Sequence, residues 1–437
     1  MTPRVDTLVV GAGISGLAYA HARGPSADLI VLEASERAGG LVRTLRDGDF
    51  RFEHGPEALR SENGELSALL RELGIEAREP PPNASKRFVV QRGKLVEVPL
   101  APHRLLTSSL LSLRGKLRLV SEPWRDPKLA LDGSVADFVR HRIGSEALDA
   151  LIDPLVGGIH AGDPERLSMR ACFPRLVTLV EQHGSLFKAL RATRGSPSPS
   201  VMKPRGGNAT LIDALAERLR DKLRLATPVT GLEYDGSRWQ VRTSNSAYEA
   251  ARVVLALPSS AAARLLSPVS APLARAIGSI TCESLVSIAH AYARDDVEHA
   301  LDGFGYLVSS RERLHHLGTL FSSRIDVECC PEDWVLLRTM IGGARHPEVV
   351  DWSDEQILDC LAREVAPLLG LRRKPTWTSI QRWRATLPRF ELPHVERVAT
   401  IERSLPPRLT LLGNWLHGIG VNHLVAAASV AARGPRD

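Results

Sequence analysis

The chain has 437 residues, 43% of them hydrophobic, which is enough apolar material for two or three folded domains and excludes a disordered protein. Its net charge of +6 comes without long basic runs, so binding to nucleic acid is not expected. The apolar stretches are too short or too interrupted to cross a membrane, and the five cysteines lack C-x-x-C spacing, which indicates a reducing compartment without a disulfide framework.

The first predicted unit is a strand, a glycine-rich turn, a helix and a second strand. An apolar run over 7–10 leads into Gly11-Ala12-Gly13-Ile14-Ser15-Gly16, and a second run over 29–32 ends at Glu33. The first glycine permits the tight turn, the second lets the backbone approach a pyrophosphate, and the third lets helix and strand pack closely. The acid is placed to accept a hydrogen bond from a ribose hydroxyl. This unit predicts dinucleotide binding, and its early start leaves no room for a signal or transit peptide.

The segment after the second strand favours FAD over NAD. Gly39 and Gly40 add two flexible backbone amides, and Arg43 adds a cation that can reach the same pyrophosphate. The acid at the end of the second strand favours an unphosphorylated ribose, which argues against NADP.

Residues 85–204 are predicted to be mainly helical, and one stretch within them is both basic and apolar. Between Pro102 and Lys128, arginines and lysines alternate with leucines such as Leu110 and Leu111, and Trp124 lies near the end. Such a segment is suited to an anionic membrane surface, or is an ordinary amphipathic helix docked on its own core. We expect the two leucines and the tryptophan to form the membrane-facing surface.

Two later segments of the chain are predicted to pack with the first unit. Residues 1–84, 205–258 and 399–437 should form one Rossmann-like α/β domain, interrupted by the helical insertion 85–204 and by a mixed α+β substrate-binding insertion, 259–398. A second glycine-rich turn, 418–422, precedes an Ala-rich helix and offers backbone donors to a flavin or phosphate. The His315-His316 pair is expected on the surface, because no carboxylate or cysteine follows at metal-binding spacing, and no metal site is predicted.

Several motifs in the two insertions resemble those of the FAD-dependent, oxygen-dependent protoporphyrinogen oxidase family, within the wider amine oxidase and carotenoid desaturase group. The resemblance covers nearly the whole chain. The glycine-rich start belongs to the whole group, whereas the more specific segments are 86–88, 153–169, 303–307, 317–323, 342–345 and 413–422.

The resemblance implies contacts to non-covalently bound FAD and to a porphyrinogen. Together with the glycine-loop argument, it assigns these residues to FAD: Gly11, Ala12, Gly13, Ile14, Ser15, Gly16, Glu33, Ala34, Gly40, Leu41, Arg43, Gly55, Pro56, Glu57, Ala58, Val229, Trp383, Ile419, Gly420 and Val421. It implies that Arg87 pairs with a substrate propionate and that Gly157, Leu307, Leu320 and Met340 line the substrate site. Two departures from the family pattern concern His423 after the last flavin motif and Met340, where an aromatic residue is usual.

The reaction implied by the resemblance is the six-electron oxidation of protoporphyrinogen IX to protoporphyrin IX by oxygen, with release of hydrogen peroxide. The chemistry is centred on the flavin, and no side chain of this sequence is predicted to be catalytic. The family also implies peripheral attachment to the inner face of a bacterial cell membrane, and is compatible with a homodimer and with product transfer to a ferrochelatase.

Three alternatives remain open at this point. A relative that oxidises coproporphyrinogen III would need more cations for its four carboxylates. An amine oxidase would show a pair of aromatic residues around the amine, and this chain is only 5% aromatic. A non-catalytic binding protein of the same fold, like the prenyl-GTPase chaperones, would lack a redox flavin, which Glu33 and the motif 418–422 argue against.

Overall fold

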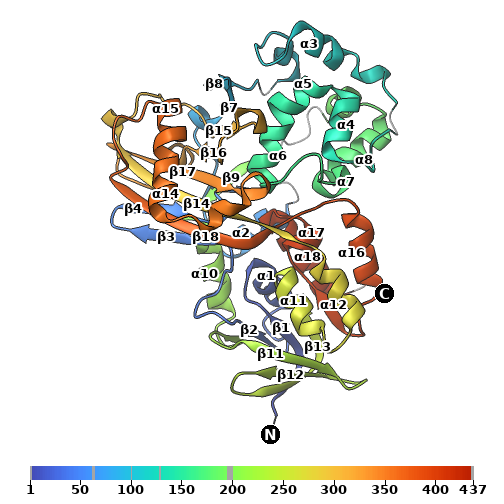
Figure 1. The fold of residues 1–437 in the computed structure, drawn as a ribbon. Helices are drawn as coiled ribbons and strands as arrows, with labels where there is room; N and C mark the ends of the chain where they lie inside the picture. Colours follow the sequence, from blue (N-terminus) through green and yellow to red (C-terminus); the bar gives the residue numbers. More distant parts are fainter. Residues whose placement is uncertain (1, 62–63, 100, 127–128, 194–199, 435–437) are drawn as a thin grey trace.

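The computed structural model describes residues 2–61, 64–99, 101–126, 129–193 and 200–434. Two large β-sheets and a group of helices make up the molecule, with the first sheet at the bottom of Figure 1 and the helical part at its upper right. Segments that are distant in the chain meet in each sheet, so the sheets define the architecture.

The first sheet is seven-stranded, in the order β10-β2-β1-β13-β12-β11, with β19 also paired to β13. β1, β2, β10, β13 and β19 pair in parallel, whereas β11 and β12 are antiparallel to their neighbours. The strands are β1 (Arg4–Val10), β2 (Leu29–Leu32), β10 (Leu223–Arg224), β11 (Val229–Tyr234), β12 (Trp239–Thr243), β13 (Ala247–Leu255) and β19 (Leu409–Leu411). The N-terminal strands, the 205–258 segment and the C-terminal segment therefore share one sheet.

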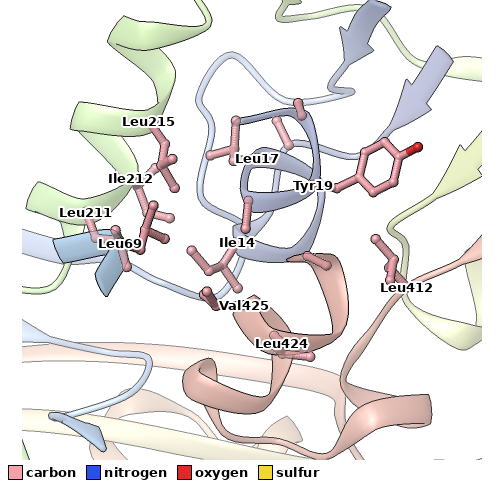
Figure 2. Close-up of a cluster of buried hydrophobic side chains, with 14 of the residues drawn as sticks. Ile14, Leu17, Tyr19, Leu69, Leu211, Ile212, Leu215, Leu412, Leu424 and Val425 are labelled. Atoms are coloured by element: carbon pink, nitrogen blue, oxygen red, sulfur yellow. The ribbon is translucent and has the colours of Figure 1, made fainter. Parts of the chain in front are cut away.

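Helices cover both faces of this sheet, which explains the continuous apolar runs of its strands. In β1, Val9 contributes to one apolar cluster and Leu8 and Val10 to the other. The first cluster, shown in Figure 2, joins α1 (Ile14–Ala22), α2 (Glu65–Glu72), α10 (Ala209–Arg218) and α18 (Val421–Arg433). The second joins α11 (Ser259–Leu266), α12 (Ala271–Gly278), α16 (His394–Arg403) and α17 (Asn414–His417).

The second sheet is also seven-stranded, in the order β18-β14-β17-β16-β15-β7-β8. Its strands are β7 (Arg87–Gln91), β8 (Lys94–Glu97), β14 (Cys282–Ala293), β15 (Gly305–Val308), β16 (His316–Leu320), β17 (Trp334–Gly342) and β18 (Trp377–Pro388). All pairs are antiparallel except β7 with β15. One face carries α14 (Asp354–Cys360), a π-helical turn (Leu361–Val365) and α15 (Ala366–Leu369), whose apolar side chains share a cluster with the sheet.

The segment 85–204 begins with strands. The β7–β8 hairpin lies within the range that sequence patterns predict to be mainly helical, yet it pairs with β15 and extends the second sheet. Two small sheets complete the strands: β3 (Thr44–Asp47) with β4 (Phe50–Glu53), and β5 (Leu59–Arg60) with β9 (Val201–Pro204) and β6 (Ala77–Arg78). A short helix, α13 (Ser322–Ile325), follows β16.

The helical part contains seven α-helices within 101–126 and 129–193: α3 (Leu113–Val120), α4 (Val135–Arg142), α5 (Ser145–Ala147), α6 (Asp153–His160), α7 (Met169–Cys172), α8 (Pro174–His183) and α9 (Leu186–Ala192). A fully buried ion pair joins Arg142 of α4 to Glu122, whose carboxylate also accepts hydrogen bonds from the Ser185 hydroxyl (2.6 Å) and the Leu186 amide (2.8 Å). This network holds the turn 122–124 against the start of α9.

Two of the leucines expected on the membrane-facing surface are buried. Leu110 and Leu111 are each 3% exposed and pack in a cluster with Val89 of β7, so that expectation is wrong for them. Trp124 is exposed, at 80%, as expected. The other exposed large apolar residues of the described stretch are Leu106, Leu113, Leu117 and Val120, and the most exposed of these are Leu113 and Leu117, at 75% and 63%. Lys128 lies outside the described residues. Among the described residues, no helix has the length and apolar character needed to cross a bilayer.

Candidate functional site

The glycines of the first loop have distinct surroundings. A Cβ on Gly11 would lie 2.4 Å from the Ala256 carbonyl oxygen, and one on Gly16 would lie 2.0 Å from the Gly11 carbonyl oxygen. A Cβ on Gly13 would meet no described atom within 4 Å. Gly11 also has a φ of +101°, which favours glycine. Gly11 and Gly16 therefore permit the packing of strand and helix, while Gly13 leaves open space at the start of α1 that an anionic group can approach.

Glu33 lies beside this loop at the end of β2. Its Oε2 accepts a hydrogen bond from the Ala12 amide at 2.8 Å, and its Oε1 accepts from the amide and hydroxyl of Ser35 at 2.9 and 2.8 Å. A carboxylate fixed by three donors keeps lone pairs for a sugar hydroxyl. Ala34 follows directly, and Val229 begins β11 two residues after Thr227, whose amide donates to the Glu33 carbonyl at 2.7 Å.

The second glycine pair is held against the first loop. The Gly39 amide donates to the Ala12 carbonyl at 2.8 Å, and Gly39 bridges Gly13 in a parallel arrangement. Arg43 follows, with its Nη1 donating to Gln381 Oε1 at 3.1 Å and its buried Nε without a hydrogen-bond partner among the described atoms. This Nε–H lies beside two glycine-rich loops, and a pyrophosphate oxygen or a flavin carbonyl can accept its hydrogen bond.

The segment 55–58 passes close to this second loop. A Cβ on Gly55 would lie 1.9 Å from the Leu41 carbonyl oxygen, so only glycine fits there. The Pro56 carbonyl accepts from Asn208 Nδ2 at 2.6 Å, and Lys203 Nζ donates to the Glu57 carbonyl at 2.6 Å. Ala58 completes the segment. These contacts fix a loop that lies between the two sheets.

A buried polar cluster ties that loop to the second sheet. Arg338 of β17 donates to the His54 carbonyl at 2.7 Å, to Ser287 Oγ at 2.9 Å and to Glu57 Oε2 at 3.3 Å. Trp383 of β18 donates its Nε1–H to the same His54 carbonyl at 2.9 Å. Burial, with Arg338 and Arg43 nearby, lowers the pKa of His54 to about 3, so its imidazole is neutral. Trp383 of the second sheet thus contacts the residue that precedes the predicted cofactor loop.

The last glycine-rich turn leads into α18. Ile419 and Gly420 precede the helix, Gly420 is its N-cap residue and Val421 its first residue. The helix packs on α1, and Ile14, Leu424 and Val425 belong to the apolar cluster drawn in Figure 2. The free N–H groups of two helix N-termini, those of α1 and α18, thus come from the two ends of the chain to one region.

Four of the residues predicted to bind substrate share one face of the second sheet. Leu307 pairs with Gly318, and Gly318 with Met340. Gly305 pairs with both Leu320 and Arg87. Residues opposite one another, or two apart in a strand, lie on the same face, so Leu307, Leu320, Met340 and Arg87 form one surface. Arg338 lies on it too and donates to the His54 carbonyl and to Glu57, so this face looks toward the segment 54–58.

Arg87 is held at one end of this surface. Its Nη1 donates to the carbonyls of Ala84, Ser85 and Lys86 at 2.8, 2.8 and 3.0 Å, and its guanidinium lies 4.2 Å from the ring centre of Phe304. Burial lowers the pKa of Arg87, but an arginine stays charged at neutral pH. All three hydrogen bonds use Nη1, and within the described part of the chain Nε and Nη2 have no hydrogen-bond partner.

Helix α6 covers the same surface. A Cβ on Gly157 would lie 2.9 Å from Arg345 Nη2, and one on Gly158 would lie 2.3 Å from Leu307 Cδ2. Arg345 in turn donates to Asp153 Oδ1 at 2.9 Å and to the Val308 carbonyl at 2.9 Å. Gly158 therefore permits close packing between α6 and β15, and Gly157 leaves room for the Arg345 guanidinium that joins α6 to the end of β15.

The polar cluster of Glu53, His54, Lys203 and Arg338 was not predicted. Lys203 Nζ lies 3.0 Å from Glu53 Oε1, and both residues are buried. Arg338 and Glu57 are 281 residues apart in the chain, and although Glu57 belongs to a segment predicted to contact FAD, its pairing with Arg338 was not predicted. A charged residue within an otherwise apolar strand, such as Arg338 between Leu337 and Thr339, is the one signal the sequence offers.

Comparison with known proteins identifies relatives along nearly the whole chain. The model of a family described as flavin containing amine oxidoreductase matches residues 14–425. The chain is 30% identical to the chloroplastic protoporphyrinogen oxidase of Nicotiana tabacum, over 97% of this chain and 84% of that protein. It is 26% identical to the coproporphyrinogen III oxidase of Bacillus subtilis (strain 168), over 95% of this chain and 94% of that protein. A crystal structure from Exiguobacterium sp. 255-15 matches with a TM-score of 0.85 at 24% identity, covering 99% of this chain and 98% of that one.

Proposed function

The chain belongs to the flavin containing amine oxidoreductase family, and we propose that it oxidises protoporphyrinogen IX to protoporphyrin IX. Membership makes it a flavin-dependent oxidoreductase with FAD as its cofactor. The observation that carries the substrate proposal is the surface of Leu307, Leu320 and Met340 with Arg87 at one end. An apolar surface with one cation at its edge suits a large apolar ring whose carboxylates lie on one side.

The residues of this chain would hold the cofactor and position the substrate. Gly13, the Arg43 Nε and the α18 N-terminus fit the phosphates and the ring, and Glu33 fits the ribose. Bound FAD would supply hydride acceptance, with oxygen as the final oxidant and hydrogen peroxide as product. Arg87 would hold a propionate, and Met340 would pack against the macrocycle in place of the usual aromatic residue.

Replacing Arg87 tests this assignment. Arg87→Ala should lower kcat/KM for protoporphyrinogen by roughly 10- to 100-fold, because a charge-assisted hydrogen bond contributes about 1.5–3 kcal/mol. Flavin content, read from absorbance, should stay the same. Lys94→Ala, an exposed lysine at the other end of the same hairpin, is the matched control and should leave kcat/KM unchanged. Full turnover by flavin-loaded Arg87→Ala would remove Arg87 from the site, and loss of flavin would make its role structural.

Coproporphyrinogen III is the second candidate substrate, favoured by the similarity to the Bacillus subtilis enzyme. Its four carboxylates need cations on more than one side of the ring. On the described part of the sheet face, Arg338 is already paired with Glu57, which leaves Arg87 to meet a carboxylate. Purified enzyme offered each porphyrinogen should therefore yield protoporphyrin fluorescence faster. A higher kcat/KM for coproporphyrinogen would reverse the assignment and leave the family unchanged.

We further propose that the protein attaches to the surface of a membrane through α3 and the turn 122–124. Leu113, Leu117 and Val120 lie at spacings of four and three residues and are all exposed, so they form one apolar stripe on α3. Trp124 extends the stripe, and Arg114 lies exposed beside it. An amphipathic helix with basic flanks and a tryptophan suits an anionic lipid surface.

Vesicle sedimentation tests the attachment. The triple variant Leu113→Ser, Leu117→Ser and Trp124→Ser should lose most of its binding to vesicles that contain phosphatidylserine. The control is Leu190→Ser with Leu225→Ser, which changes exposed leucines outside the stripe, at 48% and 38% exposure. Equal binding by the triple variant and the unchanged protein would contradict the proposal.

A further inference from the structure

Three segments bring metal-ligating side chains together at one end of the second sheet, outside the proposed redox site. His315 directly precedes β16, His346 and Glu348 follow β17, and Glu364 lies in the π-helical turn after α14. One donor atom each from His315, His346 and Glu348 lies within 4.8 Å of the others. A register shift follows His316, the neighbour of His315, and Glu364 lies within the π turn, so two departures from regular geometry occur beside this cluster.

Glu364 fixes the orientation of His315. Its Oε1 lies 2.6 Å from His315 Nδ1, and its Oε2 accepts from the His315 amide at 2.8 Å and lies 3.0 Å from His316 Nδ1. The expectation that both histidines lie on the surface is wrong for His316, which is fully buried and also contacts the Tyr306 hydroxyl at 3.2 Å. His315, in contrast, is 31% exposed. With Nδ1–H donated to the carboxylate, its Nε2 keeps a lone pair, as in metal-ligating histidines oriented by an acid.

His346 and Glu348 offer the other two donors. His346 Nδ1 lies 3.3 Å from Glu348 Oε1, and the rings of His315 and His346 have centres 4.3 Å apart. In a tetrahedral zinc site with bonds of about 2.0–2.1 Å, neighbouring donor atoms are about 3.3 Å apart. The His346–Glu348 pair already has that spacing. The side chains of His346 and Glu348 are 26% and 56% exposed, so they can rotate and a metal can enter from solvent.

We propose that His315 Nε2, His346 and Glu348 bind a divalent transition-metal ion of the Zn²⁺ class, with water as the fourth ligand. Two imidazoles and one carboxylate are a donor set that favours zinc over magnesium or calcium. Glu364 acts as the positioning residue. The neighbouring group of His315, Cys360 and Glu364 is less suitable, because the carboxylate already accepts from both histidines and Cys360 is fully buried. Arg345, next to His346, holds α6 through Asp153, so the bound ion would lie one residue from the substrate-site scaffold.

Metal titration of the flavin-loaded protein, freed of metals by chelation and dialysis, tests the proposal. One equivalent of Zn²⁺ should bind by calorimetry, and Co²⁺ should give tetrahedral ligand-field absorption to the red of the flavin bands. His346→Ala and Glu348→Gln should each weaken Zn²⁺ binding at least tenfold, and Glu364→Gln by roughly 10- to 100-fold. His346→Ala and Glu348→Gln, at half-buried and exposed positions, should leave flavin content unchanged.

The matched control is His21→Ala. His21 and Glu72 form a histidine–glutamate pair at 3.0 Å elsewhere on the surface, outside either group that could hold a metal among the described residues. This variant should bind Zn²⁺ as the unchanged protein does. Absence of a stoichiometric Zn²⁺ site, or equal affinity in the unchanged protein and His346→Ala, would overturn the proposal. Loss of binding in His21→Ala would overturn it as well, by moving the ion to the other pair.

Discussion

Two glycines of the first loop, Gly13 and Gly16, are needed for different reasons. At Gly16 a methyl group would enter the backbone of Gly11, whereas at Gly13 it would enter open space. The backbone at Gly13 has φ −70° and ψ 176°, which any residue can adopt. Gly16 is therefore needed for the packing of strand and helix, whereas Gly13 is needed for the approach of a group to the helix N-terminus.

Substitution of Gly13 should therefore affect FAD binding, whereas substitution of Gly16 should affect stability. Gly13→Val should fold but purify with little FAD, because the branched side chain occupies the space of the pyrophosphate. Gly16→Ala should lower the free energy of unfolding by about 1–3 kcal/mol, because α1 must move away from β1. Flavin absorbance and the melting temperature of the apoprotein measure the two effects. Full flavin content in a folded Gly13→Val protein would contradict the assignment of this loop.

Residues in local motifs were predictable, and residues paired across the chain were not. The glycine-rich turns and Glu33 follow from spacing within about 30 residues, so their neighbourhood could be inferred. The place of β7 in the second sheet depends on its pairing with β15, more than 200 residues later. The burial of Leu110 and Leu111 depends likewise on that sheet, since an amphipathic pattern does not say which neighbour covers its apolar face.

Among the elements, the turn that presents Trp124 depends on one buried charge pair. Glu122 and Arg142 are both fully buried, and the carboxylate also binds the N-terminal end of α9. Removing one member leaves the other charge buried without its partner, which is strongly unfavourable. The packing of the helical part thus depends on the Glu122–Arg142 pair, and we expect substitutions of either residue to be strongly destabilising.

Glu122→Gln should lower the free energy of unfolding by about 3–5 kcal/mol, measured by urea denaturation followed by circular dichroism. Glu165→Gln is the control in the same helical part. Glu165 pairs with Arg140 at the surface, with the two side chains 48% and 43% exposed, so its loss should change stability by no more than about 1 kcal/mol. Similar effects of the two substitutions would show that the buried pair does not stabilise the helical part more than a surface pair does.

At the scale of the whole molecule, buried neutral histidines are spread through all its parts. Burial lowers the pKa of His54 and His290 to about 3, and that of His160 and His394 to about 4. Arg338 and Arg43 contribute at His54, and Arg397 at His394. In the unfolded chain these groups take up protons near pH 6.5, whereas in the folded protein they do not. The unfolded state therefore binds more protons between about pH 6.5 and 4.

The free energy of unfolding should accordingly be highest above pH 6.5. It should decline as the pH falls toward 4, by up to about 1.4 kcal/mol per pH unit for each histidine. The melting temperature of the holoprotein should drop between pH 7 and pH 5. His290→Gln, which removes one titrating group, should make that drop smaller while lowering stability at pH 7, because bonds to Tyr292 and Thr339 are changed. A melting temperature that is the same at pH 7 and pH 5 would contradict this account.

The contact of α1 with α18 has a consequence for biosynthesis. The first and last helices of the first domain pack together, and β19 joins β13 only when residues 409–411 are in place. A nascent chain on the ribosome can form the N-terminal glycine loop early, but it lacks the second helix N-terminus until Val421 and the residues after it have been translated. Loading of the cofactor is therefore expected only after residues 409–433 have been translated, and a premature stop before residue 409 would leave a protein unable to retain it.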